Sequence, residues 1–218
     1  MERTDGILDD ASFPMVKQVA QYFSDSDKFT STELVLVWTG MNDILILLEY
    51  YALGEDKMSS ILWVVEAAVV LCKTVLLMLE RGARHVVVIG SSLQSLSTSQ
   101  ESLTSTLLTQ IFNCIIRNVL SSSENILFID PTLYSPIGHF VDLTTPACNV
   151  SKINRYFGTA LTYGWSVGCN VNEPYADLVS GANVTTWLLA DDIHPTTGGH
   201  AFIAGIVWGE MRKRRWVV

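Results

Sequence analysis

The chain has 218 residues, of which 49% are hydrophobic and 17% are charged. This composition is ample for a core and excludes an intrinsically disordered chain, and the length suits a single domain over residues 1–218. The formal net charge of −8 argues against a nucleic-acid partner, because phosphate backbones are bound by basic surfaces.

Hydrophobic periodicity predicts that helices and strands alternate along the chain. In chain order we predict a helix over 15–23, a strand over 33–38, a helix over 44–53, a long helix from about 59 to 82, a strand over 84–89, a helix over 107–120 and a strand over 125–129. The Ser- and Thr-rich residues 91–105 and most of 130–191 are predicted loops, followed by a turn at 195–199 and a final helix over 200–214. Strands that alternate with helices indicate a parallel sheet, so we predict a three-layer α/β fold.

Two segments bear on membranes and export. Residues 1–12 contain four acidic residues and no apolar run, so no signal peptide is expected. Residues 61–79 are nearly long enough to span a bilayer, but Glu66 and Lys73 interrupt them, at about 2.5–3.5 kcal/mol for a charge in mid-span. A helix packed inside the protein is the favoured interpretation and membrane association the alternative. The basic residues 212–215 are interpreted as the positive end of the last helix.

Two polar segments stand where chemistry is expected in an open parallel sheet, near the carboxyl ends of its strands. Gly40-Met41-Asn42-Asp43 directly follows the predicted strand over 33–38. Asp191-Asp192-Ile193-His194-Pro195 precedes the final helix. We expect these segments to hold the candidate functional residues.

These segments resemble two sequence blocks of the GDSL/SGNH hydrolases. The phrase VWTGMNDI is similar to their block III, Gly-x-Asn-Asp after a strand, and ADDIHPTTGGH to their block V, Asp-x-x-His-Pro, as in the bacterial secreted lipase and esterase branch. The resemblance implies a flavodoxin-like three-layer α/β/α fold. It also implies hydrolysis of a small-molecule or lipid ester, without a cofactor or a metal, by a protein that is secreted or lies at the cell surface in its full-length family form.

The resemblance also implies roles for three residues. His194 would be the general base of a serine acyl-transfer mechanism, and Asp191 would orient its imidazole. Asn42 would donate its side-chain amide to the oxyanion, a contribution of about 3–4 kcal/mol where such a donor has been removed. Asp192 is an alternative partner for His194, but the family pattern favours Asp191.

The chain departs from the family pattern at the nucleophile. No Gly-Asp-Ser occurs in the sequence, and the two strands that would precede residues 33–38 are not evident. We therefore expect a truncated hydrolase that is inactive or weak as this chain, with an exposed strand edge able to self-associate. The alternative is a non-catalytic binding or regulatory protein. Ser91 and Ser92 follow a later strand and are interpreted as a polar loop at the mouth of the site.

Four cysteines allow three pairings. Cys72 and Cys114 lie in apolar helical patterns and are interpreted as buried small hydrophobic residues. The family carries cysteines near the positions of Cys148 and Cys169, so the resemblance implies a disulfide between these two. Such a bridge requires an oxidising compartment.

Overall fold

The computed structural model describes residues 14–52, 57–91, 100–148, 178–190 and 194–217. The chain divides into two compact units, Met1–Asp130 and Pro131–Val218, and each is described by itself. The first unit holds the strands and most of the helices, and the second holds irregular segments and one long helix.

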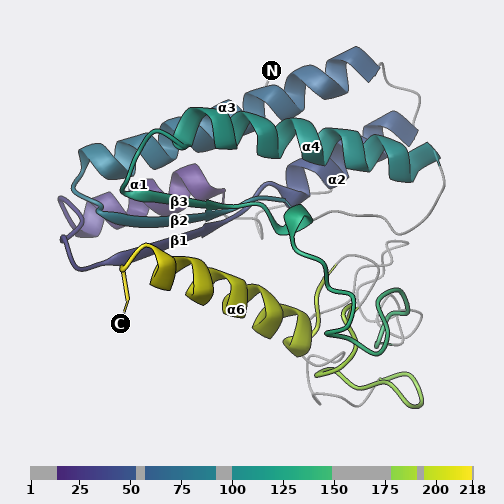
Figure 1. Ribbon diagram of the computed structural model, residues 1–218. Coiled ribbons are helices and arrows are strands. Elements are labelled where there is room, and N and C mark those ends of the chain that lie inside the picture. The colour runs from purple at the N-terminus through teal and green to yellow at the C-terminus, as the bar shows by residue number, and fades with distance from the viewer. Residues whose placement is uncertain (1–13, 53–56, 92–99, 149–177, 191–193, 218) are drawn as a thin grey trace. The chain divides into compact units, whose positions relative to one another are not determined.

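In the first unit, helices and strands alternate as the periodicity predicts (Figure 1). The elements are α1 (Met15–Asp25), β1 (Leu34–Trp38), α2 (Met41–Ala52), α3 (Lys57–Glu80), β2 (His85–Ile89), α4 (Gln100–Leu120) and β3 (Ile126–Ile129). The chain is therefore a mixed α/β protein. The third layer, the flavodoxin-like plan and the single domain over 1–218 stay predictions.

The three strands form one parallel sheet in the order β1-β2-β3. Leu34 is paired with His85, and Val86 with Ile126. This confirms that the three predicted strands are parallel and adjacent. In the described part of the chain β1 pairs only with β2, and Leu34 and Leu36 on it are 50% and 56% exposed. Self-association through this edge stays a prediction.

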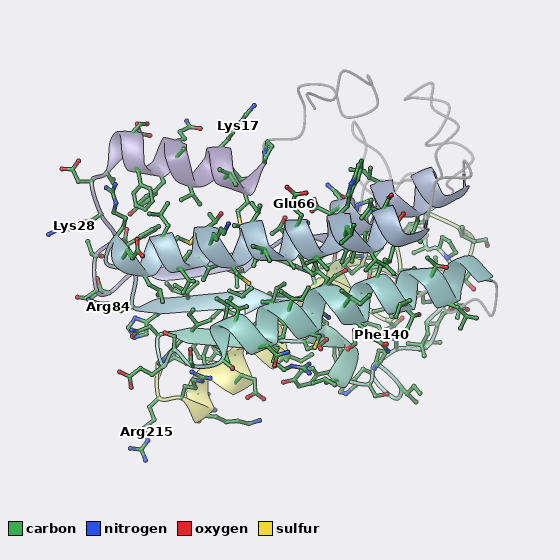
Figure 2. The ribbon with its side chains drawn as sticks, turned by 90° about the horizontal axis from the view of Figure 1, so that it is seen from above. Lys17, Lys28, Glu66, Arg84, Phe140 and Arg215 are labelled. Atoms are coloured by element: carbon green, nitrogen blue, oxygen red, sulfur yellow. The ribbon has the colours of Figure 1, made fainter. Side chains whose placement is uncertain are left out.

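The core of the first unit lies between the sheet and the helices that follow its strands. Helix α3 contacts α1, α2 and α4, and its Val64, Ala68 and Val75 are completely buried. Glu66 lies on the other, exposed face of α3 (Figure 2). Residues Ser59–Glu80 are long and apolar enough to cross a membrane, judged by length and composition alone. A core helix passes the same test, and 39% of the apolar window is buried inside the protein, so membrane association stays the alternative interpretation.

Helix α4 begins earlier than its sequence suggests. Gln100 starts the helix, so the prediction of a loop over 91–105 is wrong for its last six residues, 100–105. Ser105, whose polarity made this stretch resemble a loop, is 2% exposed. Tertiary packing therefore overrides the weak helix propensity of Ser and Thr.

The second unit begins with the short 3-10 helix η1 (Pro131–Leu133) and ends with α6 (Thr197–Lys213). Between them, single bridges join Asp142 to Trp187, Cys148 to Leu178 and Leu189 to Pro195. Helix α6 begins three residues earlier than predicted, so most of the predicted turn at 195–199 is helical.

Candidate functional site

The Gly40-Met41-Asn42-Asp43 segment carries the chain from the carboxyl end of β1 into α2. Gly40 has φ of +101°, a backbone conformation that only glycine adopts at little cost. A Cβ atom at this position would lie 2.1 Å from Cζ of Phe112 on α4. Gly40 thus serves two purposes, since it permits the turn and lets a buried aromatic ring approach the backbone.

Asn42 and Asp43 occupy the exposed side of the first turn of α2, whereas Ile44 is completely buried. The Asn42 side chain is therefore accessible at the carboxyl end of a parallel strand, where the motif predicts an amide donor. Asp43 keeps contact with water, yet surrounding protein partly dehydrates its carboxyl group and raises its pKa. A hydrogen bond between the carboxyl group and the backbone of Asp43 has the opposite, smaller effect and lowers the pKa. Since the side chain is surface-accessible, we interpret this as partial rather than full burial.

His194 is placed by a short backbone ladder in the second unit. Its carbonyl oxygen accepts a hydrogen bond from the N–H of Ala190 at 2.8 Å, and Leu189 bridges Pro195. The His194 side chain is half-buried. Asp191 lies outside the described residues, so its predicted bond to His194 stays a prediction. Asn42 belongs to the first unit and His194 to the second, and their predicted proximity also stays a prediction.

The residues after His194 form a capped helix start. The Thr196 side chain accepts a hydrogen bond from the N–H of Gly199 at 3.2 Å, as an N-cap residue does. A Cβ at Gly198 would lie 2.5 Å from the carbonyl oxygen of Thr185. The glycines therefore let another segment of the second unit lie directly against the first turn of α6.

The charge of His194 acts on His200. The pKa of His200 is lowered, first by burial of part of its ring and second by the charge that His194 acquires when it is protonated. His200 as a whole is exposed, so the burial concerns only part of its ring. His200 lies in the first turn of α6. The proton affinity of His200 thus depends in part on the charge of His194.

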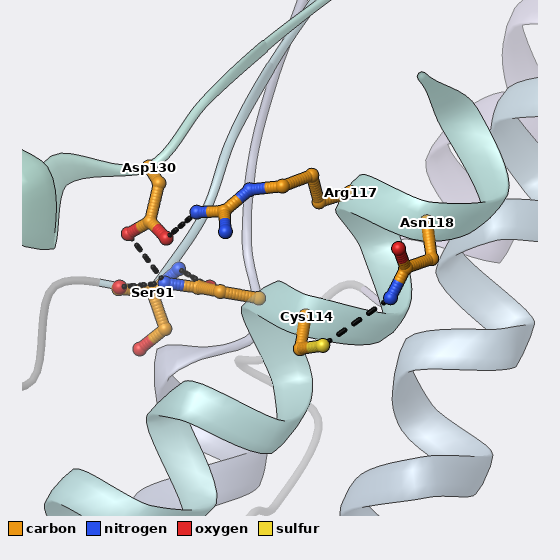
Figure 3. Close-up of polar contacts among 6 residues, drawn as sticks. Ser91, Cys114, Arg117, Asn118 and Asp130 are labelled. Carbon is orange, nitrogen blue, oxygen red and sulfur yellow. Dashed lines mark hydrogen bonds and ion pairs between the residues drawn. The ribbon is translucent and has the colours of Figure 1, made fainter. Parts of the chain in front are cut away.

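A buried polar network that the sequence did not predict joins the carboxyl ends of β2 and β3 (Figure 3). Asn113 on α4 accepts a hydrogen bond from the Ser91 N–H and donates to the Ser91 carbonyl oxygen, both at 2.9 Å. It also donates to Oδ1 of Asp130 at 2.9 Å, while Arg117 forms an ion pair with the other carboxylate oxygen. Two features of the sequence could have indicated this network. Asn113 is a polar residue on an apolar helix face, and Asp130 directly follows a strand.

Ser91 is 1% exposed, and among the described residues its Oγ makes no hydrogen bond. A nucleophile must reach substrate and a base, so Ser91 in this position is no nucleophile. Ser91 itself does not line the mouth of a site, because Asn113 holds it in the interior, and residues 92–99 of the predicted polar loop lie outside the described residues. Ser92 lies outside the described residues.

Among the cysteines, Cys72 is buried and free, as predicted, and burial raises the pKa of its thiol to about 11. Cys114 is also free but is exposed, so the prediction of burial is wrong there. Cys148 is buried and disulfide-bonded, and its predicted partner Cys169 lies outside the described residues. In the described part of the chain no group of three or more His, Cys, Asp or Glu side chains is arranged to hold a metal ion.

Neither a protein-family model nor a curated protein matches this chain. The class of protein that is shown is therefore a mixed α/β protein with a three-stranded parallel sheet.

Proposed function

We propose that this chain carries the acyl-transfer groups of a GDSL/SGNH-type ester hydrolase, on a flavodoxin-like α/β fold. The observation that carries the proposal is the turn from β1 into α2. There Gly40, at φ +101°, directs the chain so that Asn42 stands exposed at the carboxyl end of a parallel strand. Ligands of open α/β sheets bind at this edge. The Asp-x-x-His-Pro sequence at residues 191–195 supplies the second half of the proposal.

In the proposed chemistry, Asn42 donates its amide N–H to the oxygen that becomes negative when a carboxylic ester is attacked. His194 takes a proton from the attacking hydroxyl and returns it to the leaving alcohol, and Asp191 orients the imidazole. The substrate class is a small-molecule or lipid ester. Lipase and esterase activity differ in the ester that is accepted, not in these three roles.

The nucleophile has no assigned residue in this proposal. The 218 residues contain no Gly-Asp-Ser, and Ser91 is buried. Loss of a triad serine costs about a million-fold in kcat, or roughly 8 kcal/mol of barrier. We therefore propose that the chain by itself binds esters and their tetrahedral analogues but turns esters over weakly.

The test measures binding and turnover separately. A tetrahedral anion, the mono-p-nitrophenyl ester of methylphosphonic acid, is titrated calorimetrically into the full chain and into Asn42→Ala, His194→Ala and the control Asn118→Ala. We expect a loss of about tenfold or more in affinity for the first two, which corresponds to 1.4 kcal/mol, and none for the control. Affinity that is unchanged in both variants would refute the proposal.

Hydrolysis of p-nitrophenyl acetate is measured with the same proteins. We expect the chain to be no faster than its His194→Ala variant. Substantial turnover that requires both His194 and Ser91 would show that Ser91 becomes accessible and that the nucleophile was misassigned. Binding that is indifferent to Asn42 and His194 would favour the non-catalytic alternative.

A further inference from the structure

Among the described residues, three of the four large apolar side chains that are at least 70% exposed lie in one short segment of the second unit. They are Leu133, Ile137 and Val141, at 70%, 75% and 82%, and the fourth is Leu103 on α4, at 70%. The segment, residues 131–141, is PTLYSPIGHFV. Isolated exposed apolar residues are ordinary, whereas three within nine residues of one segment make that segment a candidate interaction site.

The segment contains no Asp, Glu, Lys or Arg, although the whole chain has a net charge of −8. The nearest following charge, Asp142, is held by the backbone N–H groups of Thr144 and Thr145, each at 2.8 Å. These hydrogen bonds, first the one from Thr145, lower the pKa of the Asp142 carboxyl group. A charge placed in hydrocarbon is costly, and this segment carries none.

Four backbone N–H groups of the segment already have hydrogen-bond acceptors within the protein. Pro131 and Pro136 have no N–H group. The N–H of Tyr134 donates to Pro131 O at 3.1 Å, and the N–H of His139 donates to Pro136 O at 3.0 Å. The N–H of Ile137 donates to Ser135 Oγ at 3.2 Å. The N–H of Val141 donates to Thr186 O, outside the segment, at 2.7 Å. In an apolar medium every unsatisfied backbone group is penalised, so this arrangement lowers the cost of leaving water.

The segment is also attached to a helix. The ring of Phe140 packs edge-on against Phe202 on α6, with centroids 5.7 Å apart, and the ring of His139 lies 4.9 Å from the same Phe202. Gly138 has φ of +87° at the turn between Ile137 and His139. The aromatic residues therefore hold the turn, while Leu133, Ile137 and Val141 are left facing solvent.

We propose that residues 131–141 are a lipid-contact segment that adsorbs to the surface of a neutral phospholipid bilayer and inserts Leu133, Ile137 and Val141 at the boundary between headgroups and acyl chains. Interfacial elements bury apolar side chains to a depth of about 5–10 Å in this way. A protein partner is less well matched, since interfaces between proteins carry a polar rim and intermolecular hydrogen bonds. The negative net charge favours neutral over anionic lipid. Adsorption requires no hydrolysis, so the inference goes beyond the proposed function.

The test is flotation of the full chain with phosphatidylcholine vesicles. Leu133→Asp and Ile137→Asp are compared with the wild type and with Leu103→Asp, a matched control because Leu103 has the same exposed fraction as Leu133 and lies on α4. We expect the wild type and Leu103→Asp to float equally and each segment variant to lose about tenfold or more of its vesicle partitioning. Circular dichroism checks that all four proteins are folded.

Four results would overturn the inference. The first is a wild type that does not bind phosphatidylcholine vesicles, and the second is an equal loss in Leu103→Asp. The third is binding that needs phosphatidylserine, disappears in high salt and is unaffected by the segment variants, which would assign the contact to the basic residues 212–215. If Ile137→Asp instead abolishes a concentration-dependent dimer formed without lipid, the segment contacts a second copy and the inference is wrong.

Discussion

The side chain of Asn113 on α4 forms two hydrogen bonds with the main chain of Ser91, one as acceptor and one as donor. The Asn113 Oδ1 atom accepts from the Ser91 N–H, and the Asn113 Nδ2 atom donates to the Ser91 carbonyl oxygen, each at 2.9 Å. The second N–H of the amide is available for Asp130 Oδ1, also at 2.9 Å. Asn113 is 2% exposed, so water cannot substitute for these bonds. One side chain thus ties α4 to the ends of two strands.

The first prediction is that Asn113→Ala strongly destabilises the protein. The substitution leaves a buried N–H, a buried carbonyl group and part of a carboxylate without partners, and each such group costs about 1–3 kcal/mol. We expect the free energy of unfolding, measured by urea titration, to fall by about 3 kcal/mol or more.

The matched control for this change is Asn118→Ala on the same helix. The Asn118 side chain is exposed and donates only to Sγ of Cys114, at 3.3 Å (Figure 3). Its removal should change stability by no more than about 0.5 kcal/mol. Equal losses in the two variants would show that the Asn113 network does not stabilise the fold.

The strands could be predicted because their sequences are short, apolar and rich in β-branched residues, and their order followed from the alternation with helices. The starts of α4 and α6 could not. Ser105 is helical because packing buries it, and Gly198 is helical because the chain near Thr185 lies against it. Both causes are contacts between elements, which a local propensity does not contain.

Of the candidate site, too, only the part defined by a local motif could be predicted from the sequence. The local motif places Asn42 after β1, because the glycine, the turn and the helix start lie within four residues. The partnership of Asn113 with Ser91 and Asp130 joins residues that are 22 and 17 positions apart in different elements. Only the sheet topology, which puts the ends of β2 and β3 side by side, brings them together.

The second prediction concerns Gly40→Ala. The added Cβ meets a left-handed φ of +101° and would lie 2.1 Å from Phe112 Cζ. Phe112 is 1% exposed and has no room to move without opening the core. Backbone strain of about 1–2 kcal/mol and overpacking of about 1–3 kcal/mol should together lower the free energy of unfolding by about 3 kcal/mol.

Two glycines separate these contributions. Gly138 has φ of +87° with nothing within 4 Å of a built Cβ, so Gly138→Ala should show the strain alone. Gly205 lies inside α6 with equally open surroundings, so Gly205→Ala should stabilise the helix by about 0.5–1 kcal/mol. If Gly40→Ala costs no more than Gly138→Ala, the contact with Phe112 is not tight.

The third prediction is a large difference in reactivity between the two free cysteines. Cys72 is buried, and burial raises the pKa of its thiol to about 11. At pH 8 about one Cys72 thiol in a thousand is then ionised, and the thiolate is the reactive form. Iodoacetamide should therefore modify the exposed Cys114 in the folded protein and leave Cys72 intact, as mass spectrometry of peptides would show. Equal modification without denaturant would contradict the buried position of Cys72.

The last prediction uses the electrostatic coupling between His194 and His200. The pKa of His200 is lowered mainly by burial of its ring and secondarily by the charge of His194. In His194→Ala, an NMR titration should find that the His200 pKa rises but stays below its ordinary value, since the larger cause remains.

A lowered pKa of His200 in the folded protein means that the unfolded chain binds the proton more tightly. His200 therefore reduces stability progressively as the pH falls below about 6.5, and the loss is complete once the pH lies below its folded pKa. His85→Ala, at the start of β2, is the control and should leave the His200 titration unchanged. If the His200 pKa returns fully to its ordinary value in His194→Ala, the charge of His194, and not burial, is the larger cause of the shift. If the His200 pKa does not move at all, His194 has no electrostatic effect on His200.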